Sequence, residues 1–215
     1  MAIRILLADD HRIVLDGFRG LIEKQPDMEV VGEAGDGRVA LRLTRQCSPD
    51  VIIMDVAMPN LNGVETTRQV VRDFPRVKVL ALSMNPAKRV VTQMLRAGAS
   101  GYLLKTCKFE ELIQAVRLVH AGKVYLSPDV AGGVVQDCLR RNRADKQIPS
   151  ATLSGREREV LQSVAEGRSS KEIASALHVT AKTVEAHRRH IMDKLAIRTI
   201  AGLTKHAIRE GLTAL

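Results

Sequence analysis

The sequence predicts an α/β domain built on a doubly wound, five-stranded parallel sheet, followed by a small all-α domain. Short apolar runs alternate with segments of helical periodicity up to about residue 120. Strands that are nearly all apolar, each followed by a helix, are typical of parallel sheets with helices on both faces. From residue 151 the alternation ends, and helix-start motifs follow one another closely. A length of 215 residues accommodates both domains, since one domain usually takes ~100–150 residues.

In the first domain we expect five strands, each followed by a helix. The strand segments are IRILLA at 3–8, MEVVGEA at 28–34, VIIM at 51–54, KVLALS at 78–83 and GYLL at 101–104. Helical periodicity covers segments near 12–23, 37–46, 63–73, 88–97 and 108–120. An open parallel sheet binds ligands beyond the carboxyl ends of its strands, so residues at those ends are the candidates for a functional site.

Reactive side chains stand at four of these strand ends. Asp9 and Asp10 close the first strand, and the later strand ends carry Asp55, Ser83 and Lys105. Two adjacent carboxylates repel each other by about 4 kcal/mol at ~4 Å and an effective dielectric of ~20. Mg²⁺ would relieve this repulsion, because it binds carboxylate and phosphate oxygens. Each residue taken alone also fits a helix cap, a turn or a strand-end hydroxyl, but their joint placement favours a metal and phosphate site.

The order of two acids, a third acid, a hydroxyl and a lysine resembles the receiver domain of two-component response regulators, whose fold is flavodoxin-like. This resemblance implies that Asp55 accepts a phosphoryl group from a sensor histidine kinase. It implies a Mg²⁺ site formed by Asp9 through water and by Asp10, Asp55 and the backbone carbonyl of Ala57. It further implies phosphate-binding or switch roles for Ser83, Tyr102 and Lys105.

Other phosphate-binding classes do not fit the spacing. The segment GEAGDG at 32–37 has its glycines in the wrong order for a dinucleotide site, and the sequence has no GxxxxGK[ST] motif. Phosphatases with an aspartate nucleophile carry DxD after the first strand, whereas here the two acids are adjacent. We therefore do not expect an enzyme, although a stand-alone hydrolase of the phosphatase class remains a competing hypothesis.

We expect the first domain to cover residues 1–121 and the second to cover residues 151–215. Residues 122–150 are interpreted as a helix and a linker. The helix is expected to begin at Ser127 and Pro128, because proline suits the first turn of a helix. The polar remainder includes the basic run RRNR at 140–143, for which a solvated linker is favoured over a DNA contact.

The second domain is expected to contain four helices, near 155–166, 170–177, 181–195 and 200–210. Two capping boxes support the first two helix starts, Ser154 with Glu157 and Ser169 with Glu172. Thr180 and Thr199 suit the N-caps of the other two. Apolar residues at helical spacing are expected to form the core, namely Val160, Leu161, Val164, Ile173, Leu177, Val184, Ile191 and Leu195.

The segment KEIASALHVTAKTVEAHRRHIMDKL has the layout of a helix-turn-helix motif, with a turn at His178 and Val179. Together with LSGREREVLQSVAEG it resembles the LuxR-type DNA-binding domain, and the whole chain is similar to response regulators of the NarL/FixJ family. This resemblance implies double-stranded DNA as a partner and a homodimer on activation. The candidate DNA contacts are Lys182, Thr183, Glu185, Ala186, Arg188 and Arg189. Of these, Glu185, Ala186 and Arg189 are expected nearest the base edges, while an ordinary polar helix surface is the alternative.

Composition agrees with a duplex DNA partner. The net charge is +9, and the basic excess per residue is greater behind the first domain than within it. Aromatic residues make up only 2%, whereas single-stranded nucleic acid is usually bound by stacked rings. The isolated cysteines, Cys47, Cys107 and Cys138, lack CxxC spacing and are expected to be buried thiols. Without an apolar run of ~18 residues or a signal sequence, no membrane association is expected and the cytoplasm is the expected location.

The favoured hypothesis is therefore a transcription factor that is switched by phosphorylation of Asp55. The alternative is a DNA-binding regulator that acts independently of phosphorylation, which the complete set of acids, hydroxyl and lysine makes less favourable.

Overall fold

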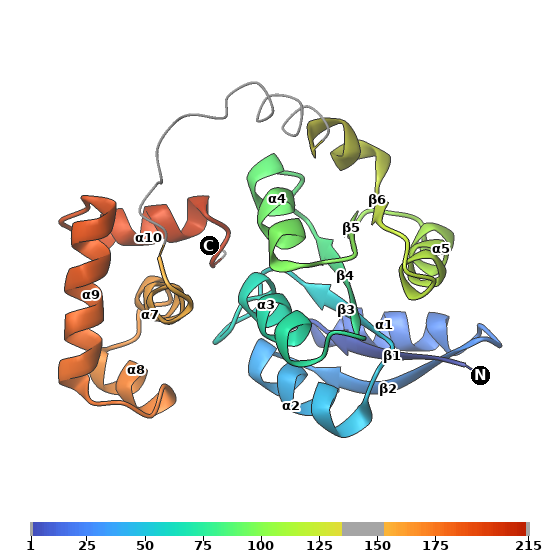
Figure 1. Cartoon of the computed structure of the whole chain (residues 1–215), viewed down its shortest axis with the longest axis horizontal. Helices are drawn as coiled ribbons and strands as arrows, with labels where there is room; N and C mark the ends of the chain where they lie inside the picture. The colour runs from blue at the N-terminus through green and yellow to red at the C-terminus, as the bar shows by residue number, and fades with distance from the viewer. Residues whose placement is uncertain (1, 135–152, 214–215) are drawn as a thin grey trace. The chain divides into compact units, whose positions relative to one another are not determined.

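The computed structural model of the chain describes residues 2–134 and 153–213 (Figure 1). The chain divides into two compact units between residues 143 and 144. The expected boundaries at residues 121 and 150 remain predictions. Residues 128–134 are helical, as Ser127 and Pro128 indicated, while the rest of the predicted linker lies outside the described residues.

The first unit is built on a parallel sheet of six strands in the order β2-β1-β3-β4-β5-β6. The strands are β1 (Ile3–Ala8), β2 (Met28–Ala34), β3 (Val51–Asp55), β4 (Lys78–Ser83), β5 (Gly101–Leu104) and β6 (Tyr125–Leu126). The doubly wound parallel sheet is confirmed, but the expected number of five strands was too low by one. The sixth strand has two residues, too few to show any periodicity, and it lies in the segment interpreted as helix and linker.

Helices cover both faces of the sheet in the described part of the first unit. They include α1 (Arg12–Ile22), α2 (Gly37–Cys47), α3 (Gly63–Asp73), α4 (Lys88–Ala97) and α5 (Phe109–His120). One core joins α1 and α5 to alternate strand residues that include Ile5, Leu7, Ile53 and Leu82. The residues between them, such as Leu6 and Ile52, point to the opposite face, which α2, α3 and α4 cover. β3 is buried throughout, and β1 and β4 are buried except at their first one or two residues, so burial on both faces explains why these central strands are nearly all apolar.

The described part of the second unit contains α7 (Gly155–Ala165), α8 (Ser170–Ala176), α9 (Ala181–Leu195) and α10 (Ile200–Arg209). Both predicted capping boxes are present, and Thr180 and Thr199 accept backbone hydrogen bonds as N-caps. The turn between α8 and α9 contains His178 with a positive φ of 53°. The predicted core residues are buried, except for Leu195, which is half-buried and packs against the core. None of the described helices is both long and apolar enough to cross a membrane.

Cys47 and Cys107 are free thiols, as expected from their spacing. Both are half-buried, whereas the sequence analysis expected them to be buried. Cys47 is the last residue of α2 and Cys107 follows β5 in a turn, and both places lie at the margin of the core. Cys138 lies outside the described residues.

Candidate functional site

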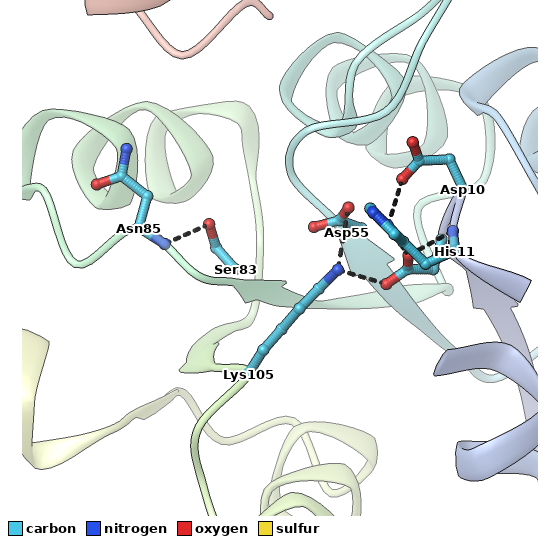
Figure 2. A network of polar contacts seen from close by, with 7 residues as sticks. Asp10, His11, Asp55, Ser83, Asn85 and Lys105 are labelled. Atoms are coloured by element: carbon cyan, nitrogen blue, oxygen red, sulfur yellow. Dashed lines mark hydrogen bonds and ion pairs between the residues drawn. The ribbon is translucent and has the colours of Figure 1, made fainter. Parts of the chain in front are cut away.

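The carboxyl ends of the strands bring the predicted acids and lysine together (Figure 2). Asp9 follows β1, Asp55 ends β3, and Lys105 follows β5. The Nζ atom of Lys105 lies 2.6 Å from Oδ2 of Asp9 and 3.2 Å from Oδ2 of Asp55. Only 12% of the lysine side chain and 5% of each carboxylate side chain are exposed. One ammonium group therefore neutralises part of the charge of two buried carboxylates.

This group lies where the strand order reverses. The chain runs from β1 outward to β2 and then returns to β3 on the other side of β1, so β1 and β3 flank the crevice of the sheet. Lys105 reaches this crevice from the far side of β4. Its backbone N–H donates to the carbonyl of Ser83 over 2.9 Å, which fixes the end of β5 against β4.

Burial raises the pKa of the Asp55 carboxyl, the charge of Lys105 lowers it, and the charge of Asp9 raises it again, with a net increase. For Lys105, burial lowers the pKa, but the hydrogen bond that Lys105 donates to Asp9 and the charges of both carboxylates outweigh it and raise the pKa overall. Lys105 is therefore protonated at neutral pH. Together with Asp10, the site contains three carboxylates, Asp9, Asp10 and Asp55, and one ammonium group. This excess of negative charge favours the binding of a further cation.

Four side chains are placed to hold such a cation. Asp9, Asp10, His11 and Asp55 each offer a ligand atom, and these atoms all lie within 4.8 Å of one another. Carboxylate oxygens are the donors that Mg²⁺ prefers, so the donor set fits the ion. Asp10, with 31% of its side chain exposed, opens the site to solvent. His11 was missed in the sequence analysis, although its position directly after the acidic pair was an available signal.

The loop between β3 and α3 holds the backbone of Asp55. The backbone N–H of Ala57 hydrogen-bonds to the Asp55 carboxylate, which favours the ionised form. The N–H of Gly63 donates to the carbonyl of Val56 over 2.9 Å, so the loop folds back on itself. Asn62 then caps α3 through its side chain. The carbonyl of Ala57 as a metal ligand remains a prediction.

The two other predicted switch residues meet in the loop after β4. Tyr102 is fully buried, and its hydroxyl donates to the carbonyl of Asn85 over 2.7 Å. The N–H of Asn85 donates to Oγ of Ser83 over 3.1 Å (Figure 2). Burial raises the pKa of Tyr102, so its hydroxyl remains a donor at neutral pH. Asn85, which the sequence analysis did not single out, thus links Ser83 to Tyr102.

In the second unit, α9 presents the predicted DNA-contacting residues. Val184 and Ile191 are buried, and they fix which side of the helix faces the core. The exposed residues are Lys182, Thr183, Glu185 and Arg189, while Ala186 and Arg188 are half-buried. Thr183 is also engaged in the start of the helix, since its N–H donates to Oγ1 of Thr180 over 3.2 Å.

Glu185 has partners within the protein. The hydroxyl of Ser170, the first residue of α8, donates to Oε1 of Glu185 over 2.6 Å. Nη1 of Arg188 donates to the same hydroxyl over 3.1 Å and lies 3.7 Å from Oε1 of Glu185. Glu185 was expected nearest the base edges, and its bond with Ser170 was not predicted. The two residues are 15 positions apart in the sequence, so no local pattern indicates that they are in contact.

Two family models match the chain. The model described as response regulator receiver domain matches residues 5–117, and the model described as bacterial regulatory proteins, luxR family, matches residues 151–207. The first match contains the acidic site, and the second contains the helix-turn-helix motif. The matches therefore fall on the two units seen in the structure.

Individual relatives match over nearly the full length. The oxygen regulatory protein NreC of Staphylococcus carnosus (strain TM300) is 40% identical over 213 residues, which is 97% of this chain and 98% of the relative. The transcriptional regulatory protein LiaR of Bacillus subtilis (strain 168) is 40% identical over 206 residues, which is 95% of this chain and 97% of the relative. A solved structure of two RcsB dimers bound to two parallel DNAs matches with a TM-score of 0.60 at 26% identity, covering 98% of this chain and 99% of that one.

Proposed function

The chain belongs to the NarL/FixJ family of two-component response regulators, and from this membership we propose that it is a DNA-binding transcriptional regulator switched by phosphorylation of Asp55. The observation that carries the proposal is the contact of Lys105 with both Asp9 and Asp55 at the strand-order reversal. A buried nucleophile, a fixed ammonium group and nearby acids are the groups that phosphoryl transfer requires, since positioning and charge neutralisation supply most of its catalysis.

In the proposed reaction, an oxygen of the Asp55 carboxylate attacks the phosphorus of a phosphohistidine on a sensor histidine kinase. The new O–P bond forms while the N–P bond breaks, and the imidazole leaves with the electron pair of that bond and takes a proton from solvent. Lys105, 3.2 Å from Asp55, lies beside the position that the phosphoryl oxygens take and neutralises part of their charge. The hydroxyl of Ser83, at the end of the neighbouring strand, donates to one of these oxygens.

The acids of the site would hold Mg²⁺ through Asp10, Asp55 and the carbonyl of Ala57, with Asp9 acting through water. The bound ion supplies positive charge that stabilises the transferred phosphoryl group. Asp9 also orients Lys105, because the two side chains are 2.6 Å apart.

The switch follows from the bonds of Ser83. Phosphorylation adds about 1.5–2 negative charges at Asp55. If the Ser83 hydroxyl turns to the phosphoryl group, the loop that contains Asn85 moves with it, and the bond from Tyr102 to Asn85 transmits this shift towards α4. The altered surface around α4 and β5 then favours a homodimer, an assembly in which the related RcsB is seen on DNA.

On DNA, α9 enters the major groove as the second helix of the helix-turn-helix motif. Lys182 and Arg189 are exposed and basic, and they are suited to contact phosphates or guanine. A dimer places two such helices on half-sites about one helical turn, ~10 bp, apart.

Footprinting on genomic DNA fragments tests this function. The parent protein and Asp55→Asn are compared with and without acetyl phosphate and Mg²⁺. We expect the phosphodonor to lower the concentration that protects DNA for the parent only. Equal protection in all four conditions would establish the regulator that acts independently of phosphorylation, whereas sustained hydrolysis of phosphate esters would establish the hydrolase.

A further inference from the structure

Asp36 joins two loops at the carboxyl edge of the sheet. It lies between β2 and α2, and Asn60 lies in the loop between β3 and α3. Oδ1 of Asp36 accepts the backbone N–H of Val39 over 2.8 Å and caps α2. Oδ2 of Asp36 accepts a hydrogen bond from Nδ2 of Asn60 over 3.1 Å. One carboxylate therefore binds two different elements, one with each oxygen.

The backbone around this bond is closely packed. A Cβ atom at Gly37, the first residue of α2, would overlap the carbonyl oxygen of Leu61 and Oγ1 of Thr66. The start of α2 therefore fits directly against the residue that follows Asn60. Asn60 itself has a positive φ of 64°, a conformation that a residue other than glycine keeps only where its surroundings hold it. The bond with Asp36 and the packing at Gly37 supply that support.

The same loop holds groups that are proposed to act in phosphoryl transfer. Ala57 donates its backbone N–H to the Asp55 carboxylate, and its carbonyl is the proposed metal ligand. The N–H of Gly63 donates to the carbonyl of Val56 and closes the loop at its base. Asn60 lies between Ala57 and Gly63, so its bond with a neighbouring loop limits how far the middle of this loop can move.

We propose that Asp36 is a positioning residue for phosphoryl transfer. Through Asn60 it holds the loop after Asp55, so that the N–H and the carbonyl of Ala57 keep the orientation in which Asp55 reacts. The inference rests on the proposed function in taking Asp55 as the phosphoacceptor, and it adds a residue from the loop between β2 and α2. A displacement of ~1 Å at a reacting group costs about 10²-fold in rate, so the loss of this restraint should be visible in the rate of labelling.

Four variants of the full-length protein test the proposal. Asp36→Ser keeps an N-cap for α2, but the shorter side chain does not reach Asn60. Asn60→Asp places a second carboxylate against Asp36. Asn60→Gly removes the bond without a change of charge, and glycine suits the positive φ. The double variant Asp36→Asn/Asn60→Asp exchanges donor and acceptor, so it restores both bonds at the net charge of the parent.

Mass spectrometry measures the rate of labelling at saturating acetyl phosphate and Mg²⁺, and tyrosine fluorescence checks that each variant is folded. We expect each single variant to slow labelling about 10-fold, and the double variant to recover the parent rate within ~3-fold. Asp50→Asn is the matched control at the opposite edge of the sheet, where Oδ2 of Asp50 accepts the N–H of Arg4 over 2.9 Å. This variant should keep the parent rate.

A double variant that stays slow would overturn the proposal. Opposite changes of rate in Asp36→Ser and Asn60→Asp would overturn it too, because these variants alter the charge in opposite directions and the effect would then be electrostatic. A parent protein that is not labelled would overturn the proposed function itself, whereas a labelled parent with unchanged rates in the folded single variants would overturn only the role of Asp36.

Discussion

Replacing Gly63 by alanine should destabilise the first unit and displace the proposed phosphoacceptor. A Cβ atom at Gly63 would lie 2.1 Å from the carbonyl oxygen of Asp55 and 2.9 Å from Cα of Val56. Both are backbone atoms, so no flexible side chain can move to relieve the clash. Overpacking of this kind costs about 1–3 kcal/mol. Gly20→Ala is the matched control, because Gly20 is exposed in α1 with no atom within 4 Å of its added Cβ.

The control should stabilise the unit by about 0.5–1 kcal/mol through helix propensity, so the two variants should differ by about 1.5–4 kcal/mol. Guanidinium unfolding followed by tyrosine fluorescence measures this difference. The chain has two tyrosines and no tryptophan, and both Tyr102 and Tyr125 lie in the first unit, so the signal reports that unit alone. Gly63→Ala should also slow labelling by acetyl phosphate, since a displacement of ~1 Å at a reacting group costs about 10²-fold. Equal unfolding midpoints for the two variants would refute the close packing.

Four further predictions concern the switch and DNA binding. Asp55→Asn should abolish covalent labelling by acetyl phosphate, as detected by mass spectrometry. In metal-free buffer at neutral pH, the same variant should stabilise the first unit against unfolding, because the raised pKa of Asp55 means that its ionisation opposes folding. This gain should disappear as the pH falls through the raised pKa towards 3.8, and unfolding curves with the same gain at every pH would contradict it. Tyr102→Phe should reduce the effect of phosphorylation on the dimerisation constant measured by ultracentrifugation, because its bond to Asn85 is lost; an unreduced effect would exclude this link. Lys182→Ala should lower the affinity for all DNA sequences alike and reduce the slope of log affinity against log salt concentration by about 0.9, because one phosphate contact is lost. Glu185→Ala should change the base preference by ~1–3 kcal/mol at one base pair. If Glu185→Ala and the parent select identical motifs from random DNA, Glu185 makes no base contact.

The sequence was sufficient to predict the longer helices and strands and the meeting of the acids with Lys105. The strands at 3–8, 28–34, 78–83 and 101–104 have the predicted bounds, because each is a mainly apolar run that ends where polar or turn residues begin. The acids and Lys105 meet because the ends of parallel strands share one edge of a sheet. These features depend on local patterns and on one topological rule.

The features that escaped prediction depend on contacts between distant residues or on very short elements. The bond between Ser170 and Glu185 joins two helices, and no periodicity records it. Asn85 matters through its backbone carbonyl, which every residue possesses. The two-residue strand β6 is defined by its pairing with β5, and nothing in its own composition distinguishes it from a turn.

The bond from Ser170 also bears on the thermodynamics of DNA recognition. An exposed glutamate normally samples many rotamers, and immobilising such a side chain on binding costs about 0.5–1.5 kcal/mol of conformational entropy. Ser170 and Arg188 hold Glu185 in one orientation in the folded protein. Part of this loss therefore occurs when the second unit folds, and the surface of α9 meets the major groove already preorganised.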